Sequence, residues 1–89
     1  MSEEGVYILK SQKNNRYYIG STNNLSRRLN QHKLGQVMST RLLRPLEFVA
    51  FIKCLDLADA RRAEYRLKKY KRKDILEKTI KDGIFPWNH

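Results

Sequence analysis

The segment Tyr17 to His32, which reads YYIGSTNNLSRRLNQH, constrains the fold more than any other part of the chain. It begins with β-forming residues that end in Gly20 and continues into a polar elbow. Asn23 or Asn24 can cap a helix that begins near Leu25, because a short side-chain oxygen accepts from the free N–H groups of a first helical turn. The segment therefore predicts a strand that leads directly into a helix.

A second β-forming run, Gly5 to Lys10, lies upstream across a polar segment, 11–16, that favours a turn. The two runs predict a β-hairpin. Side-chain alternation places Tyr7, Tyr18 and Gly20 on one face. The opposite face is the predicted core face and carries Val6, Ile8, Tyr17 and Ile19. We expect the first face to be open, with a gap at Gly20 where a ligand backbone could approach.

The rest of the chain predicts one more strand and two more helices. The first helix should stop at Gly35, and a polar, basic loop without a clear period follows over 36–45. A third strand is predicted over Leu46 to Cys54, with one face formed by Leu46, Phe48, Ala50 and Ile52. Asp56 resembles a helix cap before apolar residues at helical spacing, which are Ala60, Ala63, Leu67 and Tyr70. A third helix is predicted over Asp74 to Asp82, followed by a tail, 84–89, that packs Phe85 and Trp87 against the domain.

The charge of the chain indicates a polyanionic partner. Its 89 residues, which we interpret as one domain (1–89), include 19 Lys and Arg against 9 Asp and Glu, a formal charge of +10. Solubility needs far less, so nucleic acid is the leading candidate and an anionic membrane surface the weaker one. No membrane association is expected, because the longest apolar run, Phe48 to Ile52, has five residues and Met1 to Glu4 is polar and acidic.

The cysteine and histidine content limits the metal chemistry. Cys54 is the only cysteine and lies in an apolar run, so a reducing, cytoplasmic location is expected. With His32 and His89 as the only imidazoles, the sequence does not provide a four-ligand structural zinc site. Any bound metal is therefore expected to be a hard ion held by oxygen.

The predicted first helix carries two polar residues on its apolar stripe. Leu25, Leu29 and His32 recur at i, i+4 and i+7. Arg28 falls within that stripe, whereas Arg27 is turned about 100° away. Ordinary explanations stay open, because an arginine stem can cover apolar neighbours and a histidine near a helix end can be a capping or packing residue. The two tyrosines can likewise be simple β-packing residues.

Glu64 falls on or beside the apolar face of the second helix, where an acid needs a reason. Lys68 at i+4 and Arg61 at i−3 offer helix-surface ion pairs, which contribute only about 0.2–0.5 kcal/mol each. A basic run also starts here, with eight Lys or Arg among residues 61–73. Such a run can be a solvated face, but with the positive charge of the whole chain it favours a surface that follows phosphates.

Two triplets, GVY at 5–7 and YIG at 18–20, resemble the signature triplets of the GIY-YIG nuclease superfamily, and they are separated by ten residues. The similarity extends over about residues 5–80. The family's arginine, eight positions after the second triplet, falls on Arg28, its histidine on His32 and its helical glutamate on Glu64. In size the chain is similar to the small standalone members.

The resemblance implies an α/β domain of the α+β type, with a three-stranded antiparallel sheet flanked by about three helices, which cuts phosphodiester bonds with one divalent metal ion. It implies that Glu64 binds Mg²⁺ or Mn²⁺ through carboxylate oxygen. Tyr7 would act as, or position, the general base for the attacking water, with nearby cationic charge favouring its ionised form. Arg28 would hold the phosphate. Tyr18 and His32 would orient the nucleophile or phosphate, and His32 would assist proton transfer.

The predicted nucleic-acid contacts are Gly20, Arg27, Arg41, Arg44, Lys68 and Lys69. The sequence departs from the family in having Ser39 where small members carry a tyrosine, and Asn88 is the only candidate for a late family asparagine. We expect a monomeric endonuclease for DNA or structured nucleic acid, in DNA repair or recombination, to which a partner protein could give specificity. The alternative is a non-catalytic nucleic-acid-binding module on the same fold.

Overall fold

The computed structural model describes residues 3–88. Met1, Ser2 and His89 lie outside this range, and with them the start of the expected acidic N-terminal segment and the end of the expected tail. In chain order the elements are β1 (Gly5–Ser11), β2 (Tyr17–Thr22), α1 (Leu25–Lys33), the 3-10 helix η1 (Arg41–Leu43), β3 (Leu46–Lys53), α2 (Leu57–Lys69) and α3 (Lys73–Asp82). The predicted α+β fold with a three-stranded antiparallel sheet is confirmed. Within the described range, no helix is long and apolar enough to cross a membrane.

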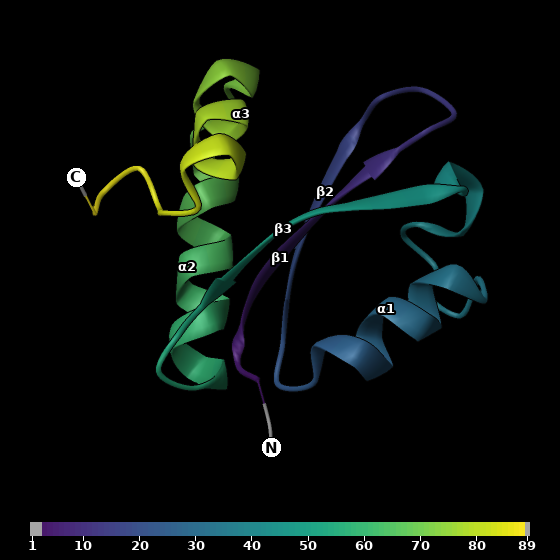
Figure 1. Ribbon diagram of the computed structural model, residues 1–89, viewed down its shortest axis with the longest axis horizontal. Coiled ribbons are helices and arrows are strands. Elements are labelled where there is room, and N and C mark those ends of the chain that lie inside the picture. Colours follow the sequence, from purple (N-terminus) through teal and green to yellow (C-terminus); the bar gives the residue numbers. More distant parts are fainter. Residues whose placement is uncertain (1–2, 89) are drawn as a thin grey trace.

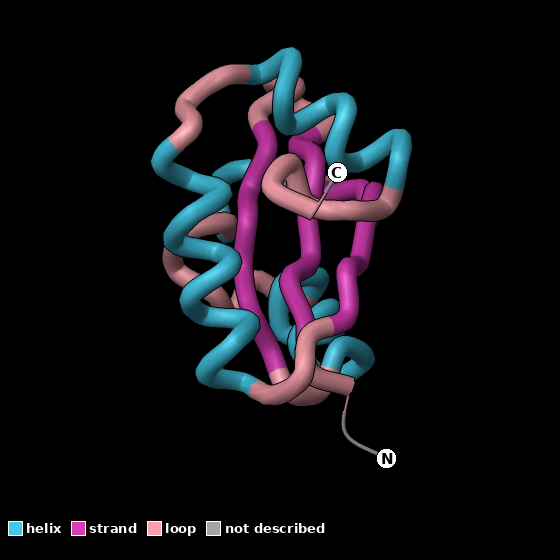
Figure 2. The backbone as a smooth tube through the Cα atoms, turned by 90° about the vertical axis from the view of Figure 1, so that its left-hand side faces the viewer, coloured by secondary structure: helices cyan, strands magenta, loops and turns pink. Residues whose placement is uncertain are grey.

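The sheet has β1 at its centre, between β2 and β3. α2 lies on one side of the sheet and is followed by α3, whereas α1 lies on the other side (Figure 1). Figure 2 shows the three strands side by side between these helices. β1 is therefore buried on both faces, as a central strand covered by helices on both sides must be. Because β2 is an edge strand, side chains near its end can meet residues from both α1 and α2.

One face of the sheet forms the hydrophobic core with α2. Val6 and Ile8 on β1 have no exposed surface. They pack against the side of α2 formed by Ala60, Ala63 and Leu67. Phe85 is only 4% exposed and stacks on Trp87 with 4.7 Å between the ring centroids. The tail up to Asn88 thus packs against the domain as predicted.

The helix ends follow the predicted signals. Asn24 caps α1, and its Oδ1 accepts a hydrogen bond from the backbone N–H of Arg27 at 3.1 Å. Asp56 caps α2 in the same way, accepting from the backbone N–H of Asp59 at 2.7 Å. α3 ends at Gly83, whose φ of 72° lies in the left-handed region that glycine adopts without strain.

The other face of the sheet carries the residues grouped around Tyr7. Tyr7 pairs with Gly20 and Leu9 pairs with Tyr18, so the predicted grouping is confirmed. The expectation that this face is open is wrong, because Tyr7 has no exposed surface and His32 of α1, buried beside it, is only 1% exposed. Strand alternation determines which side chains share a face, but it does not determine what covers that face.

β3 departs from its predicted pattern in the middle of the strand. Its pairing with β1 shifts register between Ile8 and Leu9 and passes over Val49. Phe48 therefore lies opposite Leu9 on the α1 side, whereas Ala50 lies opposite Ile8 on the α2 side. The prediction that Leu46, Phe48, Ala50 and Ile52 share one face is wrong, because a bulge of one residue reverses the alternation.

Candidate active site

A chain of hydrogen bonds runs through the buried face behind α1. Arg28 Nε donates to the Tyr7 hydroxyl at 3.2 Å, and the same hydroxyl lies 2.7 Å from His32 Nε2. His32 Nδ1 lies 2.6 Å from the hydroxyl of Thr40, which is also buried. The ring of Tyr18 lies beside this chain, 6.2 Å from the ring centroid of Tyr7 and 5.3 Å from that of His32. We call these five residues the tyrosine cluster, and it contains four of the five predicted catalytic residues.

The direction of these hydrogen bonds follows from the available donors and acceptors. Arg28 can only donate, so the Tyr7 oxygen accepts from it and keeps its own proton for His32 Nε2. A neutral imidazole has one donor and one acceptor nitrogen, so Nδ1 then donates to Thr40. The phenol proton thus points at a neighbouring base.

Burial governs the protonation of both rings. It raises the pKa of Tyr7 to about 12, and the hydrogen bond from Arg28 lowers that pKa only in part. Burial, and after it the positive charge of Arg28, lowers the pKa of His32 to about 4. The expected effect of a cation on Tyr7 is present, but desolvation outweighs it. At neutral pH the phenol is protonated and the imidazole is neutral.

The depressed pKa of His32 predicts a specific pH dependence of stability. Histidine titrates near 6.5 when exposed and near 4 in the folded protein, so the unfolded state binds more protons between these values. The free energy of unfolding should therefore fall by up to ~3 kcal/mol as the pH is lowered through this window. Urea unfolding at several pH values measures the effect. His32→Gln cannot titrate, so it should lack this part of the pH dependence, and equal pH dependence in both proteins would contradict a buried neutral imidazole.

Glu64, the predicted metal ligand, projects from α2 near the end of β2. Its Oε1 accepts a hydrogen bond from Ser21 Oγ at 2.6 Å, and its Oε2 lies 2.5 Å from Lys68 Nζ. The ion pair with Lys68 is one of the two that the helical spacing offered, and no pair between Glu64 and Arg61 occurs in residues 3–88. The Glu64 side chain is 22% exposed, so its carboxylate can still be reached from solvent.

A divalent ion fits this carboxylate only with help from other ligands. Across the described part of the chain, no three His, Cys, Asp or Glu side chains come together as a metal-binding group. Mg²⁺ is commonly held by one or two carboxylates together with waters and substrate phosphates. A single accessible glutamate therefore fits such an ion, with Lys68 giving up its contact to Oε2.

A cationic pocket between β2, α1 and α2 lies between Glu64 and the tyrosine cluster, although Glu64 itself does not line it. This pocket of about 520 Å³ includes Ser21, the hydrogen-bond partner of Glu64, and Arg28 of the tyrosine cluster. Arg27 and Arg61 also line it, and none of its lining residues is acidic. Three guanidinium groups without a carboxylate favour an anion such as a phosphate. We call this cavity the arginine pocket.

Three of the predicted nucleic-acid contacts lie at this site. Gly20 lies opposite Tyr7, and a Cβ at this position would collide with the Tyr7 ring and hydroxyl. Only glycine therefore leaves room for the phenol. Arg27 lines the arginine pocket, and Lys68 Nζ lies 5.9 Å from the centre of the Tyr18 ring.

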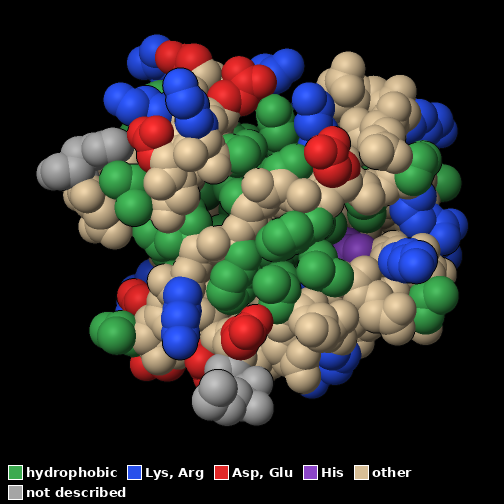
Figure 3. All heavy atoms as spheres, in the orientation of Figure 1, with side chains coloured by type: hydrophobic (Ala, Val, Ile, Leu, Met, Phe, Trp, Pro, Cys, Tyr) green, Lys and Arg blue, Asp and Glu red, His purple; other side chains and the backbone are tan. Residues whose placement is uncertain are grey.

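The remaining predicted contacts lie elsewhere. Arg41 and Arg44 line another pocket of about 730 Å³ between α1 and β3, which has a largely apolar lining that includes one side of His32. Figure 3 shows hydrophobic side chains gathered across the middle of the face that carries β3. Lys69 Nζ lies 4.5 Å from the centre of the Tyr65 ring on α2. Asn88 lines a pocket at the tail together with none of the predicted catalytic residues.

Three residues of the site are absent from the predicted set. Ser21 directly follows the YIG triplet, and strand alternation places it on the α2 side, so this contact was open to prediction. Gln31 Oε1 accepts from Arg28 Nη1 at 3.0 Å, and the i+3 spacing is a signal for such a contact on a helix. Thr40 lies in an irregular loop, and only the tertiary structure brings it to His32.

The family comparison covers most of the chain. The family model described as GIY-YIG catalytic domain matches residues 3–81 of the 89. No curated protein and no solved structure gave a match. Domains of this family are usually endonucleases and generally depend on a divalent metal, which indicates nuclease chemistry on nucleic acid. With both triplets on adjacent strands and the matched region spanning all three strands, the chain belongs to the GIY-YIG catalytic domain family.

Proposed function

We propose that the protein is a divalent-metal-dependent endonuclease that hydrolyses phosphodiester bonds in DNA and acts as a monomer. The observation that carries the proposal is the arginine pocket, where Arg28 of the tyrosine cluster and Ser21, bound to Glu64, line the same cavity. A phosphodiester in this pocket would meet the Arg28 guanidinium, which is bonded to the Tyr7 phenol, and the Ser21 hydroxyl, which is bonded to the Glu64 carboxylate. These groups can supply charge stabilisation, proton transfer and metal binding.

In the proposed mechanism, Arg28 binds the scissile phosphate and stabilises the negative charge that builds up in the transition state. The Tyr7 oxygen is buried behind Arg28, so the attacking water reaches it only when Arg28 turns from the hydroxyl to the phosphate. The phenol then takes a proton from that water as it passes its own to His32. Thr40 keeps the imidazole in the orientation that can accept this proton. Glu64 would hold the divalent ion, which, when bound, would supply neutralisation of negative charge at the phosphate.

The alternative of a non-catalytic nucleic-acid-binding module is favoured by one observation. Both oxygens of Glu64 already contact groups of the protein itself, Ser21 and Lys68. If Lys68 holds this carboxylate permanently, a metal has no ligand here. Both functions predict DNA binding that weakens with salt, with a slope of about −0.9 per neutralised phosphate when the logarithm of the binding constant for duplex DNA is plotted against the logarithm of the salt concentration. Salt dependence therefore does not distinguish them, whereas catalytic turnover does.

A cleavage panel tests the proposed function. It comprises single-stranded, duplex, branched and flapped DNA together with RNA, each with Mg²⁺, with Mn²⁺ and with a chelator. We expect at least one DNA substrate to be cut only when a divalent ion is present. Salt-dependent DNA binding without cleavage under any of these conditions would support the binding module instead.

Gly20 gives a steric test of the tyrosine cluster. Gly20→Ala should push the Tyr7 hydroxyl away from Arg28 and His32 and lower the cleavage rate about 10²-fold, as expected for a shift of about 1 Å in a catalytic group. The matched control is Gly83→Ala, whose Cβ meets nothing within 4 Å but whose φ of 72° strains an alanine. It should lose about 1 kcal/mol of stability and keep its activity. Thermal unfolding and cleavage rates of both variants provide the comparison, and a fully active Gly20→Ala enzyme would exclude the proposed role of Tyr7.

A further inference from the structure

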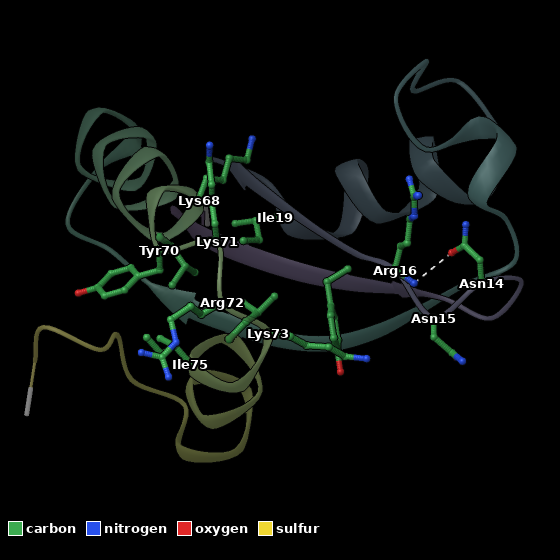
Figure 4. Close-up of a pocket in the computed structure, with 13 residues that line it drawn as sticks. Asn14, Asn15, Arg16, Ile19, Lys68, Tyr70, Lys71, Arg72, Lys73 and Ile75 are labelled. Carbon is green, nitrogen blue, oxygen red and sulfur yellow. Dashed lines mark hydrogen bonds between the residues drawn. The ribbon is translucent and has the colours of Figure 1, made fainter.

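Another pocket is lined by residues of α2 that include Lys68, the ion-pair partner of Glu64. It has a volume of about 460 Å³ and lies between the tip of the β1–β2 hairpin and the junction of α2 with α3 (Figure 4). We call it the junction pocket. We propose that it binds one unpaired nucleotide of the DNA substrate, close to the scissile phosphate. This inference rests on the proposed function and specifies its substrate as DNA with single-stranded character at the cut.

The floor of the junction pocket is apolar. Ile19 of β2 lies in the middle of the close-up, with Lys68 and Lys71 on one side and Arg16 of the hairpin on the other (Figure 4). The other apolar side chains that line the pocket are Leu67, Ile75 and Leu76, and Tyr17 and Tyr70 add aromatic rings. Phosphates are too strongly hydrated for such a floor, whereas the flat face of a base suits it. In a duplex that face is stacked, so only an unpaired base can enter.

The rim of the junction pocket is cationic. Five of its lining residues are basic and none is acidic; the basic ones are Arg16, Lys68, Lys71, Arg72 and Lys73. Lys68 pairs with Glu64 and Arg72 pairs with Asp74, but Arg16, Lys71 and Lys73 form no ion pair within residues 3–88. An apolar floor beneath several unneutralised cations complements a nucleotide, which has an apolar base and an anionic phosphate.

Lys71 occupies an unusual backbone position at this rim. It directly follows Tyr70, the C-cap of α2, and its φ of 50° lies in the left-handed region. Glycine is favoured at that position of a helix end, because a side chain there meets steric strain. Strained residues concentrate at ligand-binding segments, where the side chain has a use that offsets the strain. Binding a phosphate at the rim is such a use.

Lys68 connects the junction pocket with the proposed active site. It lines the pocket and also contacts Glu64 Oε2. Glu64 in turn binds Ser21, which lines the arginine pocket. A strand that leaves the arginine pocket along α2 would therefore pass Lys68 and then reach the junction pocket. This continuity favours a nucleotide of the same strand over an unrelated acidic peptide.

Equilibrium binding in the presence of a chelator tests the inference without any cleavage. The probes are a short single-stranded oligodeoxynucleotide, the blunt duplex of the same sequence, and a set of single strands with one abasic nucleotide moved along the sequence. We expect the single strand to bind about tenfold more tightly than the duplex. One abasic position should lower the affinity about tenfold, because it removes the base from the pocket.

Two variants locate the effect. Lys71→Gly relieves the backbone strain, so the variant should unfold at an equal or higher temperature than the parent. It should bind the single strand about tenfold more weakly, because it loses the charge at the rim. The control Lys81→Ala removes an exposed charge outside the pocket and should change the affinity less than threefold. In Ile75→Ser, the affinity should no longer depend on the position of the abasic nucleotide, because the apolar floor is lost. In the control Leu55→Ser, at an exposed site, this dependence should remain.

The inference is overturned if the duplex binds as tightly as the single strand, if no abasic position stands out, or if Lys71→Gly binds like Lys81→Ala. If Ile75→Ser unfolds, the test remains decisive, because the affinities of the wild-type protein for the set of abasic single strands already show whether one position matters. Failure of every cleavage assay would contradict the proposed catalysis, but the binding measurements need no cleavage and would still be informative. The two proposals can therefore fail separately.

Discussion

Replacing Glu64 with glutamine should lower the metal-dependent cleavage rate by about 10²–10³-fold. The amide has nearly the shape of the carboxylate and can still accept from Ser21, but it lacks the negative charge that a hard divalent ion needs. The expected loss is therefore in kcat and in the concentration of Mg²⁺ or Mn²⁺ required, and not in folding. DNA binding measured with a chelator should stay the same or strengthen slightly, because a negative charge is removed from a cationic surface.

Glu47→Gln is the matched control for this variant. Glu47 is exposed on β3, where it pairs with Lys10 in the sheet register, and it lines none of the pockets at the proposed site. It should cut at the parent rate. A direct metal titration monitored by NMR at the Glu64 carboxylate gives a readout besides activity. Cleavage by Glu64→Gln at the parent rate, or no metal response at Glu64 in the parent protein, would exclude this residue as the ligand.

Arg28→Ala should lower kcat by a similar factor, about 10²–10³-fold, because it removes a charged donor aimed at the transition state. It should also disturb the proton pathway. Arg28 donates to the Tyr7 hydroxyl and lowers the pKa of that phenol, so its removal should raise this pKa further. The variant should therefore cut slowly at neutral pH, and any residual dependence on phenol ionisation should move to higher pH.

Arg28→Lys separates charge from geometry. A lysine keeps the positive charge but lacks the planar fork that reaches Tyr7, Gln31 and a phosphate together, so it should recover only part of the rate. Arg62→Ala is the control, because Arg62 is exposed on α2 and its ion pair with Asp59 is long, at 3.9 Å. Single-turnover rates and DNA affinity should be measured for all three proteins. If Arg28→Ala cuts as well as Arg62→Ala, the arginine pocket is not the catalytic site.

Local sequence signals predicted most of the elements. The β-forming runs on either side of residues 11–16 form the predicted hairpin, and the caps at Asn24 and Asp56 and the stop at Gly83 lie where the side chains indicate. These features depend on neighbours within about four residues, through strand alternation, helix periodicity and capping hydrogen bonds. The same short-range rules place Arg28 and His32 on one stripe of α1.

The sequence did not determine features that depend on contacts between distant segments. The bulge opposite Ile8 and Leu9 depends on how β3 pairs with β1, and it reversed the expected faces of half of the strand. The burial of Tyr7 depends on α1 folding back over the sheet, and it makes desolvation, and not the nearby cation, the dominant influence on the pKa of the phenol.

The candidate site shows the same division. The sequence by itself determined the family, the spacing of the two triplets and the identities of Tyr7, Arg28 and Glu64 as candidates. Only the tertiary structure decided that Thr40 holds His32, that Ser21 and Arg28 line one pocket, and that Lys68 leads from Glu64 to the junction pocket. The physical reason is that periodicity and capping act along the chain, whereas burial, hydrogen-bond networks and cavities arise where segments dozens of residues apart come into contact.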